Sequence, residues 1–237
     1  MPLLFNFCDK QTNTAQLIRC IKKVVSEITK TGFHIVATVC DQGSSNVAAI
    51  NELLFQTRKK RNLENRAQNQ TYEVGNQEII HLYDPPHLIK GIRNNWLSKD
   101  VLQVSNAPGE ENQFASWDIL KTAWIIDRKI NTIRPLLKKI TAEHMVEEKI
   151  SKMRVKNAVQ AMSGTMASAI QTFATSKCTV SVNNEEIQIG EKEGIATATA
   201  VNFFNDLFDS VNGDDKREDS NDLRCSVSKN SDHHVFW

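Results

Sequence analysis

The sequence lacks both glycine-rich phosphate loops that nucleotide-binding folds commonly use. Neither G-x-x-x-x-G-K-[ST] nor G-x-G-x-x-G after an expected strand occurs in its 237 residues, which excludes the two common phosphate cradles. No apolar stretch approaches the roughly 20 residues of a membrane span, and the apolar N-terminus lacks the basic segment of a signal peptide. Five cysteines without a C-x-x-C pair fit a reducing compartment. We therefore expect no membrane partner and no disulfide framework.

The near-zero net charge of +1 hides a local asymmetry. Residues 56–76 contain few apolar side chains and are predicted to form a mobile loop. Its basic cluster could contact a DNA backbone without reading the base sequence. An ordinary solvated loop or a targeting signal is the alternative interpretation. The cluster consists of Arg58, Lys59, Lys60 and Arg61.

The first part of the chain has the pattern of an α/β sheet. Short apolar runs at 2–8, 34–40 and 78–83 predict strands, and the intervening periodicity predicts helices at 14–30 and 46–55. Strands joined by helices through short turns favour parallel pairing with a right-handed crossover. We expect 34–40 and 78–83 to be adjacent and parallel, with 2–8 in the same sheet. Their continuous apolar character predicts burial on both faces.

Asp41 follows the strand at 34–40 and precedes a glycine turn. A carboxylate at the carboxyl end of a core strand is where α/β sheets place their chemistry. The alternative is a turn residue that caps the next helix. The next strand ends at Asp84-Pro-Pro-His87, where the prolines suit a helix start and Asp84 is a candidate N-cap. We expect His87 near the same edge as Asp41.

From about residue 106 the pattern becomes helical. Helices are predicted at 114–130, 150–174 and 193–211, and a hairpin at 177–189 around Asn183-Asn184. The Met and Trp residues of these helices are interpreted as core rather than ligands. Residues 213–237 are predicted to be a polar, poorly ordered tail.

These residues leave three kinds of function open. The first is a divalent metal site for phosphoryl transfer, built from Asp41 and carboxylates elsewhere. The second is a nucleotide-binding module, and the third is a non-catalytic interaction domain. The histidines do not decide between them, because none has a metal-ligand spacing with a cysteine.

Several motifs in order along the chain resemble those of P element transposases and their THAP-domain relatives. Asp41 lies in the first motif, and the later motifs follow in family order over nearly the whole chain. In combination they are far more specific than any one of them. The motifs are Gly32-Phe-His-Ile-Val-Ala-Thr-Val-Cys-Asp-Gln-Gly-Ser-Ser-Asn46, Asp84-Pro-Pro-His-Leu-Ile-Lys-Gly-Ile-Arg-Asn94, Lys152-Met-Arg-Val-Lys-Asn-Ala-Val-Gln160, Asn205-Asp-Leu-Phe-Asp-Ser-Val-Asn212 and Leu223-Arg-Cys-Ser-Val-Ser-Lys-Asn230.

The resemblance implies an RNase H-like mixed sheet interrupted by a mainly helical GTP-binding insertion domain. Its domains would be a core at 1–97, the insertion at 98–195, a returning core helix at 196–212 and a tail at 213–237. It implies a nuclear protein that cleaves and joins DNA at transposon ends, with GTP and Mg²⁺ as cofactors. Association with further copies of the chain stays open. Lys90 is a candidate phosphate contact, although a solvated helix-face lysine is the competing interpretation.

The sequence departs from the family pattern at its acids. Asp41 matches the second of three metal-binding acids, whereas the first belongs to a D-E-M-S-like motif that in the family precedes the segment resembling Pro2-Leu-Leu-Phe5. Asn202 stands where the family has its Glu, and Asp206 or Asp209 would be a substitute only under a shifted alignment. The zinc-coordinating DNA-binding domain of the family is also not in this sequence. We therefore expect a truncated or degenerate transposase, with a domesticated nucleic-acid- or protein-binding domain and a gene-model fragment as alternatives.

Overall fold

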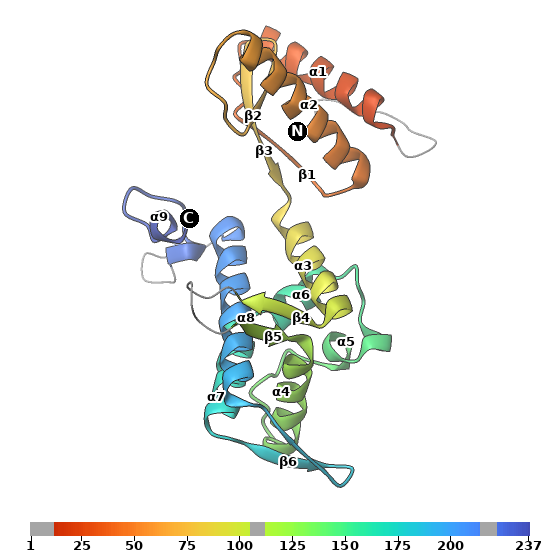
Figure 1. Ribbon diagram of the computed structural model, residues 1–237, viewed down its shortest axis with the longest axis vertical. Coiled ribbons are helices and arrows are strands. Elements are labelled where there is room, and N and C mark those ends of the chain that lie inside the picture. The colour runs from red at the N-terminus through yellow and green to blue at the C-terminus, as the bar shows by residue number, and fades with distance from the viewer. Residues whose placement is uncertain (1–11, 105–111, 214–221) are drawn as a thin grey trace. The chain divides into compact units, whose positions relative to one another are not determined.

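The computed structural model describes residues 12–104, 112–213 and 222–237 in two compact units, which Figure 1 shows. The first unit extends to Leu88 and the second begins at Ile89. The expected strand at 2–8 lies outside the described residues. The domain limits expected at residues 97, 195 and 212 stay predictions. Within the described ranges, no helix is long and apolar enough to cross a membrane.

The first unit is built on a three-stranded sheet with the order β1-β3-β2. Strand β1 (Ala37–Cys40) pairs in parallel with β3 (Gln77–Tyr83), which confirms the predicted pairing. Strand β2 (Thr71–Val74) pairs antiparallel with β3. Helices α1 (Thr14–Lys30) and α2 (Ser44–Leu63) pack on one face of this sheet. Their shared core consists of Val25, Ile50, Leu53, Tyr72 and Ile79.

The opposite face of the sheet is apolar and exposed within the described residues. Val39 is 60% exposed, Ile80 45% and Leu82 53%. The prediction of burial on both faces is therefore wrong for the described unit, because both of its helices pack on the other face. β-Branched residues fill both sides of these strands, and the sequence pattern alone cannot tell which side is covered.

The predicted mobile loop at 56–76 is also wrong. Helix α2 continues to Leu63, and most of the remaining segment leads into β2. The buried stripe of α2 continues from Leu53 to Thr57 and Arg61 at intervals of four residues, and both polar side chains are buried. The Thr57 hydroxyl donates to the Leu53 carbonyl at 2.9 Å and accepts from the Glu73 amide at 2.8 Å. Polar hydrogen bonding therefore replaces apolar burial in this half of the helix.

The second unit is mainly helical and holds two small hairpins. Helix α3 begins in the last residues of the first unit and continues into the second. The other elements follow in chain order. They are α3 (Pro85–Lys99), β4 (Val101–Val104), β5 (Gln113–Ser116), α4 (Trp117–Ile130), α5 (Ala142–Met145), a 3-10 helix (Glu147–Lys149), α6 (Val155–Ala161), α7 (Gly164–Thr175), β6 (Thr179–Val182), β7 (Glu185–Gln188), α8 (Glu191–Asn212), a second 3-10 helix (Asp222–Arg224) and α9 (His233–Phe236).

The hairpin of β6 and β7 and the last long helix confirm the predictions for this unit. Asn183 and Asn184 have φ values of 52° and 66°, as a two-residue hairpin turn requires. The predicted helix at 150–174 is instead two helices, because the Ser163 hydroxyl accepts from the Met166 amide and caps α7. The hairpin of β4 and β5 was not predicted. The tail contains α9 where no order was expected, and residues 214–221 lie outside the described residues.

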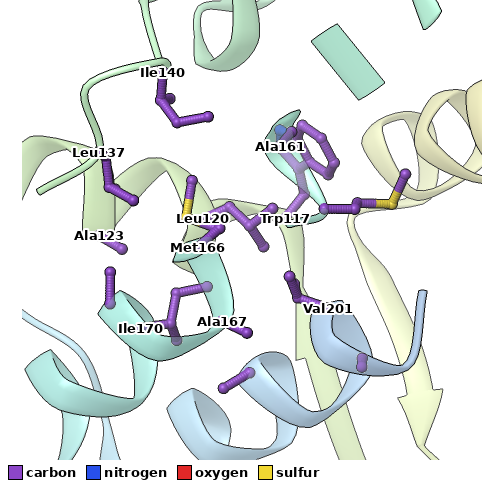
Figure 2. Close-up of a cluster of buried hydrophobic side chains, with 14 of the residues drawn as sticks. Trp117, Leu120, Ala123, Leu137, Ile140, Ala161, Met166, Ala167, Ile170 and Val201 are labelled. Atoms are coloured by element: carbon purple, nitrogen blue, oxygen red, sulfur yellow. The ribbon is translucent and has the colours of Figure 1, made fainter. Parts of the chain in front are cut away.

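Helices α4, α7 and α8 enclose the large core of the second unit, part of which Figure 2 shows. Met162, Met166 and Trp117 are buried in this core, as predicted. The prediction is wrong for Met153, which is 75% exposed. The axes of α7 and α8 approach closely where Gly194 faces Ala174, because a Cβ atom at Gly194 would collide with that side chain. This core fixes the positions of the motifs that lie on α3, α6 and α8.

Candidate functional site

Asp41 lies directly after β1 and shapes the turn into α2. Its Oδ1 accepts a hydrogen bond from the Gly43 amide at 2.9 Å and another from the Asn46 side chain at 2.7 Å. The N-cap residue of α2, Gly43, has no side chain that could cap the helix. Asp41 therefore performs the turn-forming role that was the alternative interpretation. It is also exposed, so its carboxylate remains accessible to a cation.

The adjacent strand brings a second carboxylate to the same edge of the sheet. The Asp84 amide donates to the Cys40 carbonyl at 2.8 Å, which fixes the ends of β1 and β3 side by side. The Asp84 carboxylate caps α3 by accepting from the His87 amide at 3.1 Å and lies 2.5 Å from His87 Nδ1. The expected placement of His87 near the edge that carries Asp41 is therefore confirmed. Asp84 is the N-cap that its sequence context indicated.

A hydrogen-bonded cluster behind this edge carries no charge at neutral pH. Thr38 Oγ1 lies 3.0 Å from both Tyr72 Oη and His81 Nδ1, and Cys40 Sγ lies 3.4 Å from His81 Nε2. Burial lowers the pKa of His81. Burial, and secondly the Asp41 carboxylate, raise the pKa of the Cys40 thiol. A protonated thiol beside a neutral imidazole is a poor nucleophile, so Cys40 is not a candidate catalytic residue.

Helix α8 carries Asn202, at the expected position of the third acid, and the two candidate substitutes Asp206 and Asp209. Their surroundings differ. Asn202 is exposed and donates to the Asp206 carboxylate at 3.0 Å. Asp209 is 14% exposed at its side chain and forms an ion pair of 2.9 Å with Arg224. Asn205 donates to Asp206 at 3.2 Å and to Asp209 at 3.1 Å. Because Arg224 already neutralises Asp209, Asp206 is the better candidate for a metal-binding carboxylate on this helix.

Asp41 belongs to the first unit, whereas Asn202, Asp206 and Asp209 belong to the second. The expected approach of Asp41 to within about 10 Å of the 198–209 helix, which a two-metal site requires, stays a prediction.

The basic cluster at 58–61 lies on the last turns of α2 rather than on a loop. Arg61 is 1% exposed and forms ion pairs with Glu73 at 2.9 Å and Glu78 at 3.1 Å. Lys60 also pairs with Glu73 at 2.9 Å, whereas Arg58 is exposed and donates to Gln70 at 3.0 Å. Arg61 is therefore a structural residue, and Arg58 and Lys59 are the members most available to a phosphate. A pocket of about 440 Å³ next to them is lined by Arg58, Asn62, Gln68, Asn69 and Gln70.

The charge network around Glu73 predicts a loss of stability in acid. Burial would raise the pKa of Glu73, but hydrogen bonds from Lys60, Arg66 and Arg61 outweigh it and lower this pKa from 4.5 to about 2. A carboxyl group whose pKa is lower in the folded state stabilises the fold above its unfolded pKa, and this contribution disappears as the pH falls towards the folded pKa. The first unit should therefore lose up to about 3 kcal/mol between roughly pH 5 and pH 2 from this group.

Urea unfolding of the wild type and Glu73→Gln at several pH values checks this expectation. The difference in unfolding free energy between the two proteins should be largest at pH 7 and should shrink as the pH falls. A difference that stays constant with pH would contradict the assignment.

Arg93 is a buried residue that sequence analysis missed, and it connects two of the family-like motifs. It is 1% exposed, and its Nη2 donates to the carbonyls of Ser151 at 3.2 Å and Lys152 at 3.1 Å. Asn94 also donates to the Lys152 carbonyl, at 3.3 Å. Burial lowers the pKa of Arg93. The motif at 84–94 therefore positions the start of the motif at 152–160, and the half-buried Lys90 lies one turn before Arg93 on the same helix.

The remaining motifs also make contacts with one another in the second unit. The Asn205 side chain accepts from the Gly164 amide at the start of α7, at 3.0 Å. Arg224, from the motif at 223–230, reaches Asp209 of the motif at 205–212. Residues far apart in the sequence that resemble one family's motifs are therefore joined in space.

Comparisons with known proteins identify the class and then the family. A family model described as TNP-like, GTP-binding insertion domain matches residues 86–222, more than half of the chain. The solved Drosophila P element transposase strand transfer complex matches with a TM-score of 0.68 and 20% identity. The match covers 96% of this chain but 45% of that chain, so this chain spans less than half of the structure it resembles. No curated protein matches the sequence.

The class is therefore that of transposase-related proteins with an inserted GTP-binding domain. The chain belongs to the P element transposase-like family. At 20% identity the structural match establishes a shared fold, which by itself does not fix activity, cofactors or partners.

Proposed function

We propose that this chain is a GTP-binding part of a P element-type transposase machinery that acts on DNA and lacks a complete catalytic centre. The observation that carries the proposal is the family match over residues 86–222, which coincides closely with the second compact unit. The contacts of Arg93 with Ser151 and Lys152 support it, because they hold two family motifs in one place. The bound nucleotide is GTP, and Lys90 is a candidate contact for its phosphates.

The first unit supplies part of an RNase H-like core in this proposal. The parallel pair of β1 and β3, with Asp41 and Asp84 at its carboxyl edge, supports such a core. The exposed apolar face of the sheet is a second support, because a complete core would cover it. Carboxylate oxygens suit a hard cation such as Mg²⁺, so Asp41 would hold the ion.

Asn202 favours a non-catalytic role as the second candidate function. An amide at the position of the family Glu removes one negative charge from the metal site, and a neutral ligand binds Mg²⁺ less well than a carboxylate does. The chain would then act by binding nucleic acid or protein partners. A nuclear location follows from either role, because both act on chromosomal DNA or its assemblies.

Hydrogen exchange of the full chain with and without GTP tests the proposed nucleotide site. GTP should slow amide exchange in α3, α6 and the segment between α5 and α6, because a ligand protects the backbone that it orders. ATP at the same concentration should cause little protection. Equal protection by both nucleotides, or protection confined to the first unit, would contradict the proposed site.

A further inference from the structure

The second unit presents a basic loop that the motifs do not include. This basic loop comprises residues 128–140, which are the end of α4 and the segment after it. It contains five cations, and no Asp or Glu occurs from Arg128 through Ala142. Its acid-free composition differs from that of the cluster on α2, where Glu73 and Glu78 pair with the arginines and lysines. The cations of the basic loop are Arg128, Lys129, Arg134, Lys138 and Lys139.

The backbone of the basic loop is held in one conformation by a buried carboxylate. Asp127 is fully buried, and its two oxygens accept from the amides of Leu136 at 2.9 Å and Leu137 at 3.0 Å. Its Oδ1 also accepts from the Asn131 side chain at 2.9 Å. A carboxylate that accepts several hydrogen bonds in the interior fixes the loop that donates them. Residues 131–140 are therefore ordered although they have no regular secondary structure.

Two buried apolar side chains and one arginine also hold the basic loop in place. Leu137 and Ile140 are 2% and 3% exposed, and Figure 2 shows their side chains pointing from the loop into the core near Ala123. Arg128 donates to the Ile140 carbonyl at 2.8 Å and so closes the loop onto the end of α4. Ordering the backbone before a ligand arrives lowers the entropic cost of binding.

The remaining side chains of the basic loop point to solvent. Lys129, Arg134, Lys138 and Lys139 are exposed and form no ion pair with any residue of the described ranges. Ile133 is 97% exposed and Leu136 52%. A rigid loop that displays four unneutralised cations around an exposed apolar tip has the charge and the preorganisation of a polyanion-binding surface.

We infer that the basic loop binds the phosphate backbone of nucleic acid, with Ile133 packing against the sugar face between the phosphate contacts. Charge complementarity favours nucleic acid as the ligand. Cations without acidic neighbours bind a polyanion most strongly, because binding releases the counterions of the polyanion. This inference rests on the proposed action of the protein on DNA. It assigns the contact to a surface that is separate from α2 and that requires no bound nucleotide.

The test is a titration of the full chain against a short fluorescein-labelled DNA duplex over a range of KCl concentrations. The test variant replaces Arg134, Lys138 and Lys139 with alanine, and the matched control replaces Lys121, Lys177 and Lys192, three exposed lysines of the same unit that lie outside the proposed nucleotide site. Thermal unfolding of each variant checks that the fold is retained. GTP binding of each variant is measured in parallel.

The loop variant should bind the duplex about tenfold more weakly or worse, and the slope of log Kd against log salt should fall by about 3. The control should remain within about twofold of the wild type. A loop variant that behaves like the wild type or like the control overturns the inference but leaves the proposed action on DNA intact. A loop variant that loses GTP rather than DNA overturns it in favour of a nucleotide contact. A wild-type chain that binds no duplex overturns both.

Discussion

Replacing Arg61 with alanine is expected to unfold the first unit while the second unit stays folded. Arg61 is 1% exposed and bonds to Glu73, Glu78 and Thr71. Removing one partner of a buried ion-pair network costs about 3–5 kcal/mol, because the remaining charges lose their compensation. The free energy of unfolding of a whole domain is only about 5–15 kcal/mol. The core cluster among the described residues of this unit is small and holds five buried side chains, so we expect most of the unit's free energy of unfolding to be lost.

Arg58→Ala is the matched control for this experiment. Arg58 lies one turn earlier on α2, is exposed, and donates to Gln70. A surface substitution of this kind should change stability by no more than about 0.5 kcal/mol. Hydrogen exchange in urea reads the two units separately, because it reports each peptide segment. Equal effects of the two substitutions, or a loss of protection in the second unit instead, would show that Arg61 does not stabilise the first unit.

The second large expected effect is the absence of Mg²⁺-dependent cleavage of transposon-end DNA by this polypeptide. The resemblance implies that Asp41 is a metal-binding acid and that Asn202 takes the position of the family Glu. A two-metal centre uses several carboxylates to neutralise ions about 4 Å apart. One carboxylate and a neutral amide leave most of that charge uncompensated. Cleavage in Mg²⁺ should therefore remain at the level of a control with EDTA, with or without GTP.

The variant Asp41→Asn is the control for this expectation. If the wild-type chain is inactive, the variant and the wild type should show the same background level of cleavage. Robust cleavage by the wild type that disappears in Asp41→Asn would contradict the prediction and establish Asp41 as a working ligand. In that case Asp206→Asn should also abolish cleavage, whereas Asp209→Asn should not, because Asp209 is already paired with Arg224.

Part of the fold follows from local patterns in the sequence. The parallel pairing of β1 and β3 was predictable because both runs are almost continuously apolar, as strands of a parallel sheet are, and a helix lies between them. The β6–β7 hairpin was predictable because Asn183 and Asn184 tolerate the positive φ values of a tight turn. The edge that carries Asp41 and His87 followed from the same pairing.

The features that sequence analysis missed depend on contacts between distant residues. The end of α2 resembled a solvated loop because its buried stripe is polar, and Arg61 is buried only through Glu73 and Glu78 on later strands. Arg93 likewise gains its role from carbonyls some 58 residues away in the chain. The break before α7 was missed because Ser163 interrupts an otherwise continuous apolar periodicity by capping a new helix.

The acids on α8 show a different limit of what the sequence can predict. Asn202, Asp206 and Asp209 have the same helical environment in the sequence. The contacts of Asp206 with Asn202 and of Asp209 with Arg224 distinguish the two carboxylates. The contact with Arg224 comes from the chain beyond α8, in a segment whose polar composition predicted little order. Asp209 could therefore be named from the sequence as a candidate metal ligand, but its ion-pair partner Arg224 could not.

Calorimetric titration of the full chain with GTP tests the central claim most directly. The account predicts one nucleotide bound per chain, and an excess of ATP should not displace it. Binding should persist in Asp41→Asn, because this residue belongs to the first unit and the nucleotide to the second. No heat of binding with GTP, or equal affinity for ATP and GTP in a chain that is folded by hydrogen exchange, would contradict the assignment of residues 86–222 as a GTP-binding insertion domain in this protein.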